Sequence, residues 1–78
     1  MNIYKDLSGR SAIAGYDIKP GAIVIEFRSG AIYTYSYGSA GAETVDEMIR
    51  LALAGRGLAT FVSRNKPHFS TKLVGLRN

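Results

Sequence analysis

The sequence predicts an α+β fold, in which a small antiparallel sheet of three to four strands has a helix packed on one face. Two observations predict it. From Ile23 to Tyr37, β-branched and aromatic residues dominate an alternating pattern with one glycine-containing break, as in half-buried strands. From about Val45 to Ala54, apolar residues recur at the spacing of one helix face. The 78 residues form one domain, 1–78, in the order β-β-β-α.

The first strand is expected from Ser11 to Ile18, after ten residues that form either a short strand or a docked arm. Its alternation gives two faces, one with Ala12, Ala14, Tyr16 and Ile18 and the other with Ile13 and Gly15. The segment Lys19-Pro20-Gly21-Ala22 indicates a type II turn, because proline fixes φ at the first central position and glycine accepts a positive φ at the second. A hairpin therefore joins the first two strands.

The second and third strands, Ile23–Phe27 and Ala31–Tyr37, are joined by a loop that decides where the tyrosines point. A two-residue turn requires a positive φ at Ser29, which serine tolerates poorly, whereas a three-residue loop requires it only at Gly30. The two loops predict different pairs: Phe27 with Ile32 for the first, and Ile25 with Tyr33 and Ile23 with Tyr35 for the second. We favour the three-residue loop, since it also separates an apolar face from a mostly polar one.

A loop, 38–41, is expected to lead into the helix. Thr44 and Glu47 fit a capping box at its start, and Gly55 suits its end. The spacing of Leu58, Phe61 and Val62 adds a second helical turn, which ends before Pro67. An edge strand within His68 to Leu76 is the last predicted element.

Charge divides the chain unevenly. Residues 1–54 hold five basic and six acidic residues, a net charge of −1, whereas residues 55–78 hold five basic and no acidic residues, a net charge of +5. This asymmetry indicates an anionic partner for the C-terminal third, although a solvated tail explains the charge equally well. The candidate binding residues are all cationic or titratable to a cation: Arg28, Arg56, Arg64, Lys66, His68 and Lys72.

Other classes of function find little support in the sequence. The chain has no cysteine and one histidine, so a thiolate or multi-histidine metal site is not expected. The six acids form no catalytic pair, and we expect neither an enzyme nor a cofactor. No apolar run reaches the roughly 18 residues of a membrane span, and no signal peptide is recognisable, so we expect a cytoplasmic protein. A homodimer is a plausible means of stabilising so small a core.

The tyrosine strand allows two interpretations. Tyr33, Tyr35 and Phe69 could offer stacking surfaces to unpaired bases, as in sheet-based RNA binders. Alternatively, Tyr33 and Tyr35 are half-buried core residues with their hydroxyls at the rim. The three-residue loop favours the second interpretation, because it pairs both tyrosines with isoleucines.

Several short motifs resemble the KTSC domain, a module at the C-terminus of some lysyl-tRNA synthetases and in free-standing bacterial and phage proteins. They are Ser8, the strand 13–17 with its Gly-Tyr-Asp end, Phe27-Arg28-Ser29-Gly30 and Tyr33-Thr34-Tyr35. The resemblance covers residues 8–37 and implies a small α+β module, with structural roles for Phe27, Gly30, Tyr33 and Tyr35 and suspected RNA binding.

Three hypotheses follow for function. The first is a non-enzymatic nucleic-acid-binding module, for RNA rather than DNA, that uses the basic C-terminal third. The second is a small phage-encoded protein that inhibits a host defence or nucleoprotein complex by protein–protein binding, as anti-CRISPR proteins do. The third is a structural homodimer without a ligand of its own.

Overall fold

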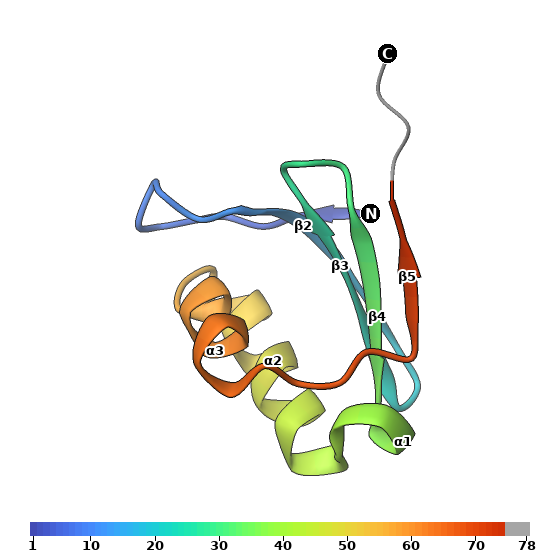
Figure 1. Cartoon of the computed structure of the whole chain (residues 1–78). Coiled ribbons are helices and arrows are strands. Elements are labelled where there is room, and N and C mark those ends of the chain that lie inside the picture. Colours follow the sequence, from blue (N-terminus) through green and yellow to red (C-terminus); the bar gives the residue numbers. More distant parts are fainter. Residues whose placement is uncertain (75–78) are drawn as a thin grey trace.

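The computed structural model describes residues 1–74 and has an α+β architecture, as predicted. One antiparallel sheet has the strand order β1-β2-β3-β4-β5, and the helices cover one of its faces (Figure 1). The strands are β1 (Asn2–Ile3), β2 (Ile13–Lys19), β3 (Ala22–Phe27), β4 (Ile32–Ser36) and β5 (Thr71–Leu73), and the helices are α1 (Tyr37–Ala40), α2 (Ala42–Ala54) and α3 (Leu58–Asn65). Within residues 1–74, no helix has the length and apolar character to cross a membrane.

The hairpin of β3 and β4 has the predicted register. Ile25 pairs with Tyr33 and Ile23 with Tyr35, and the Phe27 N–H donates to the Ala31 carbonyl at 2.8 Å. Gly30 adopts a φ of 98°, which an L-residue with a side chain rarely takes. The three-residue loop therefore turns both tyrosines toward the helices, as the turn chemistry indicated.

The face assignment of the first strand was wrong in its N-terminal half. A β-bulge lies between Ile13 and Gly15, so Ile13 pairs with Phe27 while Tyr16 pairs with Ile25. Both residues consequently face the helices, although strict alternation puts them on opposite faces. Ile13 is fully buried as a result. The strand also begins at Ile13 rather than Ser11.

Two predictions around residues 36–44 were also wrong. The expected loop forms the short helix α1, which has a capping box of its own, built by Ser36 and Ser39. Thr44 and Glu47, predicted to cap the following helix, lie inside α2 instead of at its N-cap. Tyr37 therefore opens α1 instead of ending the third strand, and α2 begins at Ala42 with Gly41 at its N-cap. The predicted end of α2 is confirmed, because Gly55 closes it in the left-handed conformation with a φ of 78°.

The core lies between α2 and the helix-facing side of the sheet. Its fully buried members come from β2, β3, α2 and the start of α3: Ile13, Ile23, Ile25, Val45, Met48 and Leu58. The N-terminal segment belongs to this core, since Tyr4 is 3% exposed and its hydroxyl accepts a hydrogen bond from the Leu58 N–H at 3.3 Å. That bond satisfies one of the free donors at the start of α3.

The two remaining predicted elements are present. The second helical turn is α3, which ends at Asn65, just before Lys66 and Pro67. The edge strand is β5, which pairs with β4 through Lys72 opposite Tyr33 and Leu73 opposite Ile32. The part of the prediction that extends beyond residue 74 lies outside the described residues.

Candidate aromatic and basic pocket

A cavity of about 540 Å³ opens beside the helix-facing side of the sheet. The chain leaves α3, crosses toward the sheet and enters β5 next to β4 (Figure 1), and this crossing segment forms one wall. The lining comes from the start of β2, the β3–β4 hairpin, α3 and the crossing segment: Ala12, Phe27, Arg28, Ser29, Ala31, Tyr33, Tyr35, Val62, Lys66, Pro67 and Phe69.

Four aromatic rings in the lining form a connected cluster. Tyr33 lies at its centre, with Phe27 at 5.3 Å and Phe69 at 4.9 Å between ring centroids, both nearly perpendicular to it. The Tyr35 ring lies nearly parallel to that of Tyr33 at 6.1 Å. Edge-to-face contacts of this kind hold each ring in a fixed orientation. Phe69 remains 46% exposed, so it presents a large apolar surface at the rim of the cavity.

Tyr35 contributes a polar atom to the lining of the cavity. Its side chain is 3% exposed, and no hydrogen bond engages its hydroxyl among residues 1–74. Because none of the buried side-chain nitrogen or oxygen atoms described lacks a partner, the small exposed part of Tyr35 must include this hydroxyl. Burial, with a smaller effect of Tyr33, raises the pKa of Tyr35 to about 12. The hydroxyl is therefore neutral at physiological pH and can both donate and accept.

Three of the predicted binding residues are brought together around these rings. Lys66 and Arg28 line the cavity, and the Lys72 ammonium lies 5.3 Å from the centroid of the Tyr33 ring. A cation at that position is attracted by the face of the ring. Lys66 reaches the site because it adopts a left-handed conformation, with φ 45° and ψ 56°, which ends α3 and redirects the chain.

The other predicted residues lie outside the cavity. Arg64 and His68 are exposed on either side of Lys66 in the sequence, but neither lines the cavity. Arg56 precedes α3, whereas Lys66 follows it, and the eight residues of the helix span about 12 Å at 1.5 Å per residue. Among the described residues of the C-terminal third, the basic side chains therefore do not form one continuous cluster.

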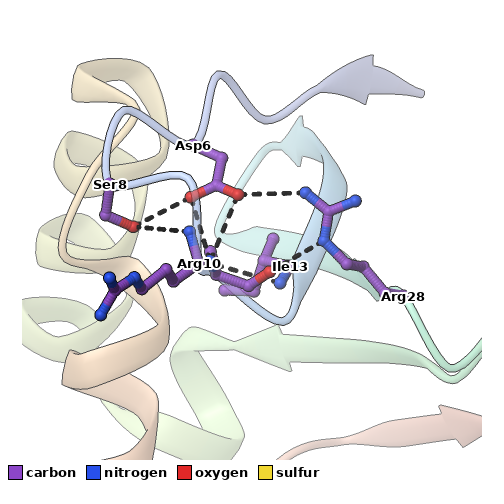
Figure 2. A network of polar contacts seen from close by, with 6 residues as sticks. Asp6, Ser8, Arg10, Ile13 and Arg28 are labelled. Carbon is purple, nitrogen blue, oxygen red and sulfur yellow. Dashed lines mark hydrogen bonds and ion pairs between the residues drawn. The ribbon is translucent and has the colours of Figure 1, made fainter.

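Arg28 has a structural partner that the sequence did not indicate. One terminal nitrogen donates to the Asp6 carboxylate at 3.0 Å, and Nε donates to the Ser11 carbonyl at 2.8 Å. Figure 2 shows the Asp6 carboxylate between this guanidinium and the Ser8 hydroxyl. The ion pair ties the tip of the β3–β4 hairpin to the N-terminal segment and fixes Arg28 at the edge of the cavity, while 59% of its side chain stays exposed.

The Asp6 carboxylate is the central acceptor of this network. Its side chain is only 6% exposed, and burial by itself raises the pKa of a carboxyl group. The hydrogen bonds from the Ser11 N–H, the Ser8 hydroxyl and Arg28, together with the Arg28 charge, outweigh burial and hold the pKa of Asp6 below its ordinary value. Asp6 therefore stays ionised and keeps Arg28 in place.

Sequence reasoning identified Arg28, Lys66 and the aromatic residues but not the cavity that joins them. Ala12, Ser29, Val62 and Pro67 carry no signal for binding, because small and apolar residues occur in every core and loop. The positive φ of Lys66 could not be predicted from the sequence either. Its place directly before a proline after a helical pattern marks a helix end, but not the direction that the chain takes from there.

Comparison with models of protein families, with curated protein sequences and with solved structures finds no match to this chain. The resemblance to the KTSC domain, the cytoplasmic location and the homodimer therefore stay predictions. Among residues 1–74, no three histidine, cysteine, aspartate or glutamate side chains lie together in a way that could hold a metal ion.

Proposed function

We propose that this chain is a non-enzymatic module that binds single-stranded nucleic acid. One observation supports this above the others: Lys66, Lys72 and Arg28, from three separate segments, surround a cluster of four aromatic rings. Proteins that bind single strands combine such cations, which contact phosphates, with aromatic surfaces, on which bases stack. Charge alone would attract any polyanion, and it is the aromatic cluster that favours a nucleic acid.

A single strand suits this site better than a duplex. The rings of Phe27, Tyr33 and Tyr35 come from the sheet, and the segment that links α3 to β5 contributes Pro67 and Phe69 to the same cavity. Bases in a duplex are stacked on their neighbours and do not reach such a surface, whereas bases of loops and free ends do. RNA is preferred to DNA in this proposal, because the KTSC module that the chain resembles is found in some lysyl-tRNA synthetases.

Binding to labelled oligonucleotides over a range of salt concentrations tests the proposal. We expect single-stranded RNA to bind at low salt and its affinity to fall as salt rises, because phosphate contacts release counterions. Lys72→Ala should lower the slope of log affinity against log salt by about 0.7, the value for one phosphate contact on a single strand. Lys19→Ala removes the same charge from the exposed end of β2 and should leave binding nearly unchanged.

Two results would overturn the proposal. One is an absence of binding to any single-stranded or structured RNA at low salt. The other is tight binding that does not respond to salt, which would exclude phosphate contacts as its source.

A protein-interaction role is the second candidate, and the open face of the sheet favours it. Ile3, Ile32 and Leu73 lie in one row across this face, with Gly15 and Glu26 between Ile3 and Ile32. No helix covers the face, and Ile3 and Leu73 are 83% and 61% exposed. Such a surface is compatible with an inhibitor of a host nucleoprotein complex. A pull-down from host lysate, analysed by sequencing and mass spectrometry, separates the candidates: enriched RNA supports the first, and an RNase-resistant protein partner supports the second.

A further inference from the structure

We propose that the cavity holds one unstacked base of the bound strand, with the adjoining phosphate at Lys66 and Arg28; this inference rests on the nucleic-acid binding proposed above. The cavity, at about 540 Å³, falls within the range of roughly 300–1,000 Å³ that is typical of small-molecule sites. It therefore has room for a single nucleotide unit, but not for a duplex.

The lining matches the two surfaces of a base. Tyr33 and Phe69 offer ring faces or edges, while Val62 and Pro67 supply aliphatic contacts. A base is planar and apolar on its faces, so it gains from this environment by stacking. Its edge is polar and needs partners, and the neutral Tyr35 hydroxyl is a partner that no described residue already occupies.

The charges at the cavity favour an anion. Both ionised residues in the lining, Lys66 and Arg28, are cations, and none of the described lining residues is acidic. Because the Arg28 charge is paired with Asp6 at 3.0 Å, Lys66 contributes most of the attraction. Arg28 is held in position by Asp6 and Ser11, yet most of its side chain remains exposed. A preorganised guanidinium of this kind can meet a phosphate without losing further side-chain entropy.

The strain at Lys66 supports the same assignment. A residue with a side chain in the left-handed conformation is uncommon, and glycine is the usual choice where a helix ends this way. Gly41, Gly55 and Gly57 occupy the other positive-φ positions at helix ends in this chain. The residue at this position is a lysine that lines the cavity. We take this as support for a functional requirement for its ammonium group.

The test compares two strands of equal length and charge, a short RNA and an oligonucleotide made of abasic units, on the intact chain. We expect the RNA to bind more tightly. Phe69→Ala should weaken RNA binding by about 5- to 150-fold, the usual range for loss of one stacking ring, and leave binding of the abasic strand unchanged. Leu53→Ala, which truncates a 60% exposed side chain on α2, is the matched control and should change neither.

Tyr35→Phe provides a second variant that keeps the ring and its packing. Losing the hydroxyl should weaken RNA binding by about 2- to 10-fold. In NMR spectra of the wild-type chain, the ring resonances of Tyr33 and Tyr35 should shift on addition of RNA but not on addition of the abasic strand. Because only the hydroxyl is removed, a loss of folding would not explain the result.

The outcomes separate this inference from the proposed function. If both strands bind equally and Phe69→Ala affects neither, the base site is refuted while phosphate binding stands. If neither strand binds at low salt, both proposals fail. If a free nucleoside monophosphate binds as tightly as the strand does, the cavity serves free nucleotides, and the strand assignment is refuted.

Discussion

Replacing Lys66 separates the cost of its backbone conformation from the contribution of its charge. The residue has φ 45° and ψ 56°, a conformation that costs an L-residue with a side chain about 1–2 kcal/mol. Glycine avoids this cost but loses about 0.5–1 kcal/mol more conformational entropy on folding than alanine does. The difference predicts that Lys66→Gly is more stable than Lys66→Ala by roughly 0.5–1 kcal/mol, since alanine keeps the strain.

Comparing the two variants with each other cancels the other contributions to the free energy of unfolding. Both lose the ammonium group and the contacts of the lysine stem, and both keep the backbone hydrogen bond from the residue 66 N–H to the Val62 carbonyl. For a domain of this length, the expected difference corresponds to about 2–8 °C in Tm. Urea unfolding followed by circular dichroism measures it directly.

The RNA affinity and the stability of the two variants should not change in parallel. Both variants should bind single-stranded RNA more weakly than the wild type, with the salt slope reduced by about 0.7, even though one of them is the more stable protein. Lys66→Gly unfolding at a lower urea concentration than Lys66→Ala would refute the reasoning about strain. Wild-type affinity in both variants would refute the role of the Lys66 charge.

Three further predictions concern the fold. Ile25→Ala should lower the free energy of unfolding by about 2–5 kcal/mol, because Ile25 is fully buried beneath the helices. Gly55→Ala should lower it by at least about 1–2 kcal/mol, since φ is 78° and the new Cβ would lie 2.8 Å from Lys5 Cβ. Asp6 has a folded-state pKa below its ordinary value, so its stabilising contribution is present above the unfolded pKa and is lost as pH falls through the folded pKa; Asp6→Asn should flatten the acid limb of the stability profile.

Each of these has a control or a contradicting result. Gly38→Ala places a Cβ within α1 at an ordinary contact distance of 3.9 Å from the Ser36 Oγ and should not destabilise the fold, unlike the change at Gly55. An Ile25→Ala variant within about 0.5 kcal/mol of wild type would contradict the burial of that residue, because such small changes are typical of surface sites. An Asp6→Asn variant whose acid unfolding is as steep as that of the wild type would show that other carboxyl groups account for it.

Local chemistry was sufficient to predict the central hairpin. Its register depends on Gly30, because only one loop length requires a positive φ at the glycine alone, and the alternation of Ile23, Ile25 and Phe27 then fixes the face of the tyrosines. The end of α2 was predictable for a similar reason, since Gly55 marks a left-handed helix end. These features depend on residues that are neighbours in the sequence.

The features that could not be predicted depend on contacts between distant segments. The bulge after Ile13 leaves no signal in the alternation pattern. The hydrogen bond between Tyr4 and Leu58, which are 54 positions apart, could not be predicted from the residues around either one. The start of α2 was misplaced because Thr44 and Glu47 have the right spacing for a capping box, whereas its N-cap is Gly41, which makes no side-chain capping bond. The serines that cap α1, at 36 and 39, lie in a stretch resembling a loop.

The cavity itself results from the way that the predicted and unpredicted parts meet. The hairpin register points Tyr33 and Tyr35 toward the helices, and α2 and the start of α3 bury the isoleucines beside them. Tyr35 thus packs in the core while its hydroxyl reaches the cavity, and Tyr33 packs against the core while its ring contacts Phe69 and Lys72. The interpretations of the tyrosine strand as core and as binding surface are therefore compatible, because the same rings stabilise the fold and form the floor of the cavity. Substitutions that remove either ring would confound stability with binding, and for that reason Phe69 and the Tyr35 hydroxyl are the informative positions.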